Sequence, residues 1–327
     1  MPALLEVQNL NVAYYSSTGM SSPALLNLSF AVRPAEILCV LGESGSGKST
    51  LAASLLGLLP PNGKITSGNV LFEGQDLLQT SELELEQIRG KRISLIFQEP
   101  SVALHAAMRV ADQIAEVLRA HESMDSATLR YKTRQTLSLL FRSDTERFAN
   151  SYPHQLSGGQ QQRVLIAQAI VCGPSLVIAD EPTAFLDAAT RSETLLLLKE
   201  LREALGIAMI LITHDPAVVA SLGDRVLILY GGRLVERGPT RSVLSSPQHP
   251  YTQALLRCLP ADLNESNAQR KTKLPVIGGE SARPSFAAVG CVFEQRCADR
   301  MEVCSRREPV TIAVSKGQAV SCFKFGG

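Results

Sequence analysis

Gly42-Glu43-Ser44-Gly45-Ser46-Gly47-Lys48-Ser49-Thr50 is the stretch that decides the fold, and it fits the pattern G-x-x-x-x-G-K-[ST] throughout. It follows an apolar run at 37–41 that predicts a buried strand, and it precedes residues 51–56, which predict a helix. Glycines let the backbone wrap closely around a phosphate, and the N–H groups of a helix N-terminus attract the anion. We therefore expect a phosphate-binding loop, called the P-loop below, rather than a Gly/Ser-rich linker. In it Lys48 reaches the phosphates and the Ser49 hydroxyl binds Mg²⁺.

The composition is that of a globular protein with a sizeable core. The chain has 327 residues, of which 45% are hydrophobic and 19% charged, with a formal net charge of +1. The absence of a basic excess argues against nucleic acid as a partner. Residues 1–6 lack the basic and apolar regions of a signal peptide, and no uncharged apolar run is long enough to predict a membrane span.

Alternating strands and helices predict an α/β fold. Strands are expected at 5–15, 25–32, 37–41, 68–74, 93–97, 176–179 and 208–212, with a hairpin over 226–236 around Gly231-Gly232. Helices are expected at 188–205 and 216–222, and the helical spacing of apolar residues between 110 and 148 predicts a helical insert. Such alternation implies a mainly parallel sheet covered by helices. Residues 263–288 have the composition of a linker.

Carboxylates follow the apolar strand at 176–179. Asp180 is placed to bind Mg²⁺, and Glu181 is placed to orient or deprotonate the attacking water. Taken alone, this pattern is more often that of a strand that meets a solvated turn. The P-loop favours the catalytic interpretation.

Two further polar side chains come at predicted strand ends. His214 follows the strand at 208–212 and Gln98 follows the strand at 93–97. Open α/β sheets bind ligands at this edge, so we expect His214 to contact the γ-phosphate and Gln98 to reach Mg²⁺ or the water. A lone histidine is otherwise more often structural.

Leu156-Ser157-Gly158-Gly159-Gln160, called the signature below, predicts a helix start. Ser157 is placed to cap a helix that begins near Gly158, and such a helix start is a second anion site. The alternative is simply a glycine-rich helix start.

The signature, just ahead of Asp180-Glu181-Pro182-Thr183, resembles that of ATP-binding-cassette (ABC) ATPases. The P-loop, Gln98, Leu186-Asp187 and Thr213-His214-Asp215 fall in the order that this family shows, over about residues 4–240. The resemblance implies an ABC cassette of the P-loop NTPase class, with a RecA-like parallel-sheet core, an antiparallel β subdomain and a helical insert at about 100–165. It implies an ATP-binding domain over 1–244 and a small C-terminal extension over 245–327.

The family also implies roles for the site residues. Two cassettes would form a head-to-tail dimer in which the P-loop of one subunit and the signature of the other enclose ATP. ATP would be bound by Tyr14, which stacks on adenine, by P-loop residues Gly42, Glu43, Ser44, Gly45, Ser46, Gly47, Lys48, Ser49 and Thr50, and by Gln98. The partner's ATP would be contacted by Ser157, Gly158, Gly159 and Gln160. Asp187 would lie in a loop at the dimer interface. Ser49, Gln98 and Asp180 would hold Mg²⁺, and Glu181, His214 and Lys48 would act in catalysis.

The segment 246–256, with His249-Pro250-Tyr251, resembles the extension of ATPase subunits that serve dipeptide, oligopeptide and nickel importers. Such subunits act at the cytoplasmic face of the inner membrane, with two permeases, a second ATPase and an extracytoplasmic binding protein. The chain departs from the pattern of these subunits at three places. Ala184-Phe185 stands where a small pair is usual, and His105 stands where asparagine is usual. The run at 141–148 lacks the usual Val-Gly-Leu type of sequence.

The C-terminal extension carries four cysteines, Cys291, Cys297, Cys304 and Cys322. In a chain without an export signal, such a set points to metal rather than to disulfides. The set resembles that of dipeptide-importer subunits, which implies a [4Fe–4S] cluster, while zinc and unliganded thiols stay open. Cys39 and Cys172 lie in apolar runs and are expected in the core.

These observations predict an ATP-hydrolysing importer subunit whose cargo is a peptide, nickel or a related small solute. Three alternatives remain. A soluble mechanical ATPase acting on DNA or ribosomes would need a long heptad arm, a second cassette or a basic excess, none of which the sequence has. An exporter is disfavoured by the segment 246–256. A cassette that binds ATP without turnover stays open because of the unusual Phe185. It is disfavoured by intact Lys48, Asp180, Glu181 and His214.

Overall fold

The computed structural model describes residues 2–258, 277–279, 289–315 and 317–326. The chain forms two compact units that each combine distant segments. Unit 1 consists of Met1–Leu5, Ala31–Ile37 and Leu71–Ile212, and unit 2 consists of Glu6–Phe30, Leu38–Val70 and Thr213–Gly327.

Parallel strands form the centre of unit 1. Strand β7 (Leu176–Asp180) lies between β6 (Ile93–Ile96) and β8 (Ala208–Thr213), and Ile178 pairs with both Leu95 and Ile210. The side chains of residues 176–179 are fully buried, as their continuous apolar run predicted. Because the strands are parallel, their carboxyl ends lie at one edge of this sheet.

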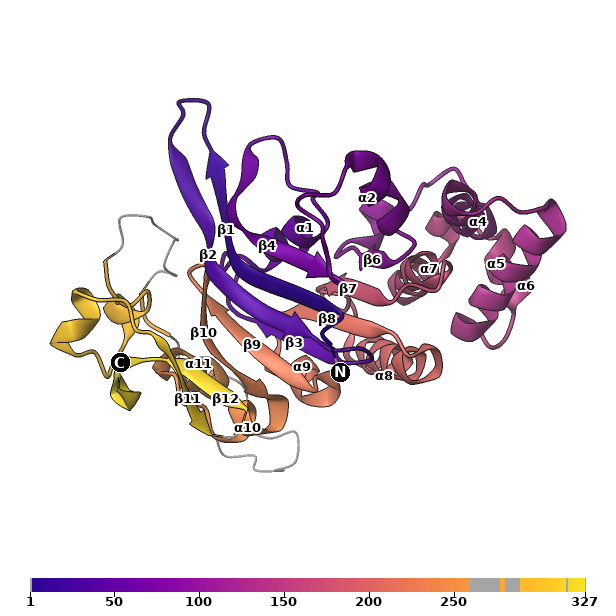
Figure 1. The fold of residues 1–327 in the computed structure, drawn as a ribbon. Coiled ribbons are helices and arrows are strands. Elements are labelled where there is room, and N and C mark those ends of the chain that lie inside the picture. Colours follow the sequence, from indigo (N-terminus) through magenta and orange to yellow (C-terminus); the bar gives the residue numbers. More distant parts are fainter. Residues whose placement is uncertain (1, 259–276, 280–288, 316, 327) are drawn as a thin grey trace, which may run out of the picture. The chain divides into compact units, whose positions relative to one another are not determined.

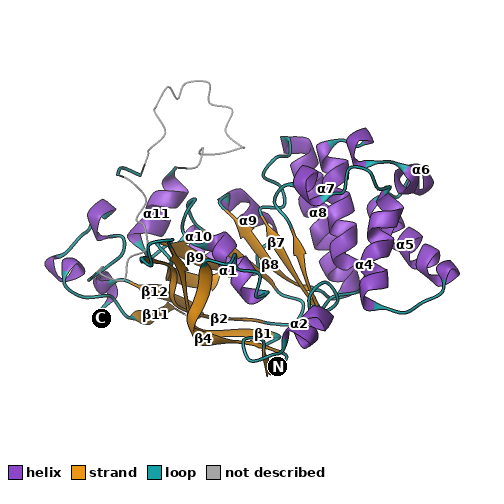
Figure 2. Cartoon of the chain, turned by 90° about the horizontal axis from the view of Figure 1, so that it is seen from above, coloured by secondary structure: helices purple, strands orange, loops and turns teal. Residues whose placement is uncertain are grey.

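Helices α4 (Val110–His121), α5 (Ser126–Leu140), α6 (Thr145–Asn150) and α7 (Gly158–Ile170) pack on one another in unit 1. Figures 1 and 2 show this group, which confirms the predicted helical insert. The helical spacing of apolar residues explains the packing, since Ile114 and Leu118 are both fully buried. The other elements of unit 1 are β5 (Gln75–Asp76), α2 (Glu82–Ile88), α3 (Pro100–Ala103), the 3₁₀ turn η1 (Pro153–Gln155) and α8 (Ala188–Leu205).

A second run of strands organises unit 2. Strand β3 (Ile37–Leu41) pairs in parallel with β9 (Arg225–Tyr230), and β9 pairs antiparallel with β10 (Arg233–Pro239). The hairpin turns at Gly231 and Gly232, which have positive φ angles of 52° and 76°. This confirms the predicted hairpin, because glycine adopts such angles without steric cost.

The C-terminal extension continues this sheet. Strand β12 (Gln318–Ser321) pairs antiparallel with β10, and β11 (Thr311–Ser315) pairs antiparallel with β12, as Figure 1 shows in yellow beside orange. The sequence analysis did not predict these two strands. Its predicted linker at 263–288 lies outside the described residues, apart from 277–279.

Strands β2 (Ser21–Val32), β1 (Leu5–Tyr15) and β4 (Gly63–Phe72) lie side by side in a separate sheet. The first two form a hairpin, closed by a hydrogen bond of 2.9 Å from the backbone N of Ser16 to the O of Met20. Both were predicted, although β2 begins four residues before the expected start. The remaining elements of unit 2 are α1 (Lys48–Leu55), α9 (Pro216–Leu222), α10 (Thr240–Ser245), α11 (Pro250–Arg257), and the 3₁₀ turns η2 (Glu294–Arg296), η3 (Glu302–Ser305) and η4 (Phe323–Phe325).

No helix among the described residues is long and apolar enough to cross a membrane.

Candidate functional site

The P-loop connects β3 to α1, as the sequence predicted. Gly47 caps α1 with a φ angle of 105°, a conformation that favours glycine. At Gly42 a Cβ atom would lie 2.2 Å from the carbonyl oxygen of Leu229 in β9, so no larger residue fits there. Both glycines are therefore required by the path of the backbone.

Lys48 is held inside this loop. Its side chain is buried, and Nζ donates hydrogen bonds of 2.8 Å to the Gly42 carbonyl and 2.9 Å to the Glu43 carbonyl. The Ser46 hydroxyl is also buried and has no hydrogen-bond partner among the described residues. An orphaned buried hydroxyl beside a lysine in a glycine-rich loop fits a phosphate ligand, which would supply the missing partner.

Tyr14 lies close to the same helix. Its hydroxyl is 3.1 Å from the Thr50 Oγ1 atom in α1, and its side chain is partly exposed. The structure thus brings together two residues that the sequence analysis assigned to ATP binding. The partly exposed ring is compatible with stacking on a base.

Asp180 and Glu181 come at the carboxyl end of β7 in unit 1. Glu181 has a positive φ of 49°, and its backbone N donates to the Ile212 carbonyl at 2.9 Å. Non-glycine residues rarely adopt this conformation, and those that do are frequent at functional sites. The strained position agrees with the role assigned to Glu181.

The signature begins α7 as predicted. The Ser157 hydroxyl accepts a hydrogen bond from the backbone N of Gln160, whose side chain in turn accepts from the backbone N of Ser157. This capping box satisfies two of the free N–H groups of the helix start. Its glycines differ, because a Cβ atom at Gly159 would lie 2.2 Å from Thr190 Cγ2, whereas one at Gly158 would meet nothing within 4 Å.

Unit 1 also contains a hollow of about 380 Å³ that brings Gln98 and Gly158 to one place. Phe185, one of the unusual residues noted in the sequence, lines the same hollow with 64% of its surface exposed. A large exposed aromatic ring is a feature of protein contact surfaces.

Asp187 is the N-cap of α8. Its carboxylate accepts hydrogen bonds from the backbone N–H groups of Ala189 and Thr190 and from the Thr190 hydroxyl. The bonds from Thr190 and Ala189 lower the pKa of Asp187.

His214 is exposed and lies between β8 and α9 in unit 2, the unit that also carries the P-loop.

The four cysteines of the extension are free thiols in one neighbourhood. The backbone N of Cys291 donates to the Cys304 carbonyl at 2.7 Å. Burial raises the pKa of Cys291 to about 11, and the nearby thiols of Cys304, Cys322 and Cys297 add to this effect. Among the described residues, no group of three or more His, Cys, Asp or Glu side chains could hold a metal ion. The residues as arranged do not fit the expected cluster, and the structure gives it no support.

The two other cysteines that were expected in the core differ. Cys39 is fully buried in β3, as predicted. Cys172 is only partly buried, where it packs against Leu118 and Leu129 of the helical group.

Two residues near the P-loop were missed by the sequence analysis. The Tyr251 hydroxyl accepts a hydrogen bond of 2.9 Å from the backbone N of Glu43, and the Arg296 guanidinium forms an ion pair of 2.8 Å with the Glu43 carboxylate. Tyr251 lies in the segment 246–256, for which the sequence analysis gives only a resemblance to the extension of importer ATPase subunits. Nothing in the sequence links either residue to a loop more than 200 positions away.

Comparison with known proteins identifies the family. Residues 25–184 match the model of the family described as ABC transporter, and 235–304 match the one described as oligopeptide/dipeptide transporter, C-terminal region. The dipeptide transport ATP-binding protein of Bacillus subtilis is 39% identical over 325 residues, covering 99% of this chain and 95% of that protein. This chain belongs to the ABC transporter ATPases. The oligopeptide transport ATP-binding protein of Salmonella typhimurium is 40% identical over 321 residues, covering 98% and 93%.

The fold agrees with this assignment. A dimeric ATP-binding cassette solved in a post-hydrolysis state with ADP and phosphate is 30% identical, with a TM-score of 0.64 over 72% of this chain and 99% of that one. The ABC cassette fold expected from the sequence is therefore confirmed, and with it a family activity in which ATP hydrolysis is coupled to transport.

Proposed function

We propose that this ABC ATPase energises the uptake of di- or oligopeptides, or of nickel or a related small solute, across the inner membrane. The observation that carries the proposal is the match of 235–304 to the C-terminal region of oligopeptide/dipeptide transporters, in a chain whose relatives are peptide transport ATP-binding proteins along nearly their whole length. A soluble mechanical ATPase or an exporter has no specific observation in its favour.

The partners follow from this proposal. Two permeases, a second ATPase that is a copy or a relative of this chain, and an extracytoplasmic solute-binding protein would complete the transporter. The chain would sit at the cytoplasmic face of the membrane as a peripheral subunit. In this arrangement residues 1–244 are the ATP-binding domain, with a helical subdomain at about 100–165, and 245–327 are the extension.

The residues divide the chemical work between them. The loop N–H groups, the Ser46 hydroxyl and Lys48 would bind the phosphates, and Tyr14 would hold the base. Glu181 would orient the attacking water and take its proton as the water oxygen bonds to the γ-phosphorus. The bond from that phosphorus to the β–γ bridging oxygen would break, and ADP would leave. His214 would contact the γ-phosphate. In the dimer, Ser157 and Gly158 of one subunit would face the ATP of the other.

Ser49, Gln98 and Asp180 would hold Mg²⁺. Hydroxyl, amide and carboxylate oxygens are the ligands that this ion prefers, so the donor set fits. The bound ion would neutralise charge that develops on the phosphate oxygens.

The direct test is Mg²⁺-dependent ATP hydrolysis and uptake of a labelled dipeptide by the chain, reconstituted with its permeases, its second ATPase and its binding protein. We expect turnover that rises with the permeases and is lost in Glu181→Gln while ATP binding is retained. Glu203→Gln, an exposed glutamate on α8, is the matched control and should behave as the unchanged chain.

Other outcomes point elsewhere. ATP binding without turnover in every assembly would favour the non-hydrolytic cassette and direct attention to the exposed Phe185. ATP hydrolysis accompanied by uptake of labelled nickel, without uptake of the dipeptide, would support the importer function and identify nickel as the cargo.

The iron–sulfur cluster expected at Cys291, Cys297, Cys304 and Cys322 stays a prediction. It rests only on the resemblance of the cysteine spacing to that of dipeptide-importer subunits. Iron and acid-labile sulfide, measured in the chain purified without oxygen, would decide it. Absence of both would leave the four cysteines as unliganded thiols.

A further inference from the structure

Arg296 of the C-terminal extension forms a bidentate ion pair with Glu43 of the P-loop. Arg296 Nη1 lies 2.8 Å from Glu43 Oε2, and Nη2 lies 3.3 Å from Glu43 Oε1. Only 7% of the Arg296 side chain and 19% of the Glu43 side chain is exposed. Two parallel charge-assisted hydrogen bonds between largely buried side chains have a specific geometry, so they hold the extension and the P-loop in one position relative to each other.

The Arg296 guanidinium is itself held on its remaining sides. Nη1 also donates to the Tyr230 hydroxyl at 3.1 Å, at the end of β9. Nε donates to the Gly278 carbonyl at 2.9 Å and Nη2 to the Ile277 carbonyl at 3.1 Å. Lysine could not make this set of contacts, because its ammonium is a point donor without a planar fork.

Tyr251 holds the same P-loop residue by its main chain. Its hydroxyl accepts the hydrogen bond from the Glu43 backbone N at 2.9 Å, and its side chain is fully buried. The ring packs against Tyr230 at a centroid distance of 4.5 Å and against Phe293 at 5.4 Å. Glu43 is therefore held by both its side chain and its backbone, in each case from the extension.

Glu43 also connects these residues of the extension to Lys48 of the P-loop. The carbonyl of Glu43, the residue that Arg296 and Tyr251 hold, accepts the hydrogen bond of 2.9 Å from Lys48 Nζ. A shift of Glu43 would thus move one of the two carbonyls that locate the lysine.

We propose that Arg296 is a positioning residue for the P-loop, and that the C-terminal extension thereby sets how tightly the cassette binds nucleotide. The inference rests on the proposed role of the P-loop and Lys48 in binding the phosphates of ATP. Arg296 would act on Lys48 through Glu43, whose carboxylate it binds and whose carbonyl accepts from Lys48 Nζ. Its loss should weaken nucleotide binding more than it slows the chemical step.

The test compares the full chain with Arg296→Ala, Arg296→Lys, Glu43→Gln and the double variant Arg296→Ala/Glu43→Gln. Affinity for a fluorescent ADP analogue is measured without turnover, and KM and kcat for ATP are measured in the assembled transporter. We expect Arg296→Ala to weaken binding by about 2- to 30-fold, the range for coupling through a packed network, and to raise KM more than it lowers kcat. Lysine should restore only part of the affinity. The double variant should be no weaker than the worse single one, because both remove the same ion pair.

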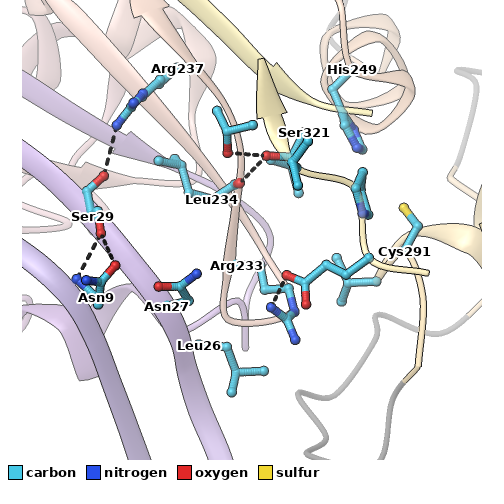
Figure 3. Close-up of a pocket in the computed structure, with 16 residues that line it drawn as sticks. Asn9, Leu26, Asn27, Ser29, Arg233, Leu234, Arg237, His249, Cys291 and Ser321 are labelled. Carbon is cyan, nitrogen blue, oxygen red and sulfur yellow. Dashed lines mark hydrogen bonds and ion pairs between the residues drawn. The ribbon is translucent and has the colours of Figure 1, made fainter. Parts of the chain in front are cut away.

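Arg233→Ala is the matched control. Arg233 likewise joins the body of unit 2 to the extension through an ion pair, in which Arg233 is largely buried and Glu308 is exposed, but that pair lies at a separate cavity (Figure 3). This variant should bind the ADP analogue as the unchanged chain does. If it weakens binding as much as Arg296→Ala, the effect is general loosening of the extension and the inference is wrong.

Failure of the inference and failure of the proposed function give different results. An unchanged chain that binds no ADP analogue would overturn the P-loop assignment itself. An unchanged chain that binds it, beside an Arg296→Ala variant of equal affinity, would overturn only the role of Arg296. Additive losses in the double variant would also overturn the inference.

Discussion

The carboxylate of Glu236 on β10 accepts a hydrogen bond from the backbone N of His249 at 2.9 Å, and both residues are fully buried. The same carboxylate accepts from the backbone N of Gln248 and from the Gln318 side chain, each at 2.8 Å. His249 in turn caps α11, since its Nδ1 atom accepts from the backbone N of Tyr251 at 3.0 Å. This chain of bonds places Tyr251, and so fixes where the extension meets the P-loop.

Glu236→Ala should therefore destabilise the extension. The change removes the acceptor of two buried donors, the His249 backbone N and one N–H of the Gln318 amide, and of the partly buried Gln248 backbone N, while the Gln318 amide keeps its second bond to the Ser246 carbonyl. Each buried donor left without an acceptor costs about 1–3 kcal/mol, so we expect a loss of about 2 kcal/mol or more in the free energy of unfolding. Because the chain has no tryptophan, urea unfolding followed by circular dichroism is the suitable measurement. Glu203→Ala, at an exposed position of α8, should change stability by less than about 0.5 kcal/mol, and equal effects of the two variants would contradict this account.

The buried His249 should make the protein sensitive to acid. Burial lowers the pKa of His249 from 6.5 to about 3, so the folded protein keeps this side chain neutral. Protonation would also remove the acceptor that caps α11. The unfolded chain binds the proton below about pH 6.5, so the stabilisation is complete above that pH and is lost as the pH falls toward 3. The expected slope is about 1.4 kcal/mol per pH unit.

The variant His249→Asn isolates this effect from other titrating groups. Asparagine can still cap the helix but does not titrate. We expect the stability advantage of the unchanged chain over the variant to shrink between pH 6.5 and 5, measured by urea unfolding at each pH. A constant difference across that interval would show that His249 is not the responsible group.

The two glycines of the signature should respond differently to alanine. At Gly159 the added methyl overlaps Thr190 Cγ2, and Thr190 cannot simply rotate because its hydroxyl is bonded to Asp187. We expect Gly159→Ala to lower stability by about 1–3 kcal/mol. Thr190→Ser removes the methyl and keeps the hydroxyl, so it should rescue the variant.

Gly158→Ala meets no such obstacle within the chain. Its stability should be unchanged or slightly higher, because alanine favours helices over glycine by up to about 1 kcal/mol. Its ATPase activity should nevertheless fall, since the proposed role of Gly158 is close approach to the partner subunit's ATP. Thermal melts and ATPase assays on both variants separate the two effects. Full activity in Gly158→Ala would remove the signature from the proposed mechanism.

The elements that the sequence predicted well are those with strong local signals. The strand at 37–41 and the helices at 188–205 and 216–222 have the predicted bounds, because a continuous apolar run and clear capping residues mark them. The short helix α2 was missed, although Ser81 and Glu84 form a capping box that could have indicated it. Strands β11 and β12 were missed because short, half-exposed strands carry little periodicity.

The sequence by itself determined the nucleotide chemistry of this protein. The P-loop, the signature and the acidic pair at the carboxyl end of β7 can each be recognised from a few consecutive residues, because their chemistry depends on local spacing. Only the tertiary structure decided what holds the P-loop in place. Glu43 and Arg296 are 253 positions apart, and no local pattern pairs one glutamate with one arginine over that separation. The pairing arises because β10 and β12 join in one sheet and Glu236 anchors α11, which together carry the extension to the loop.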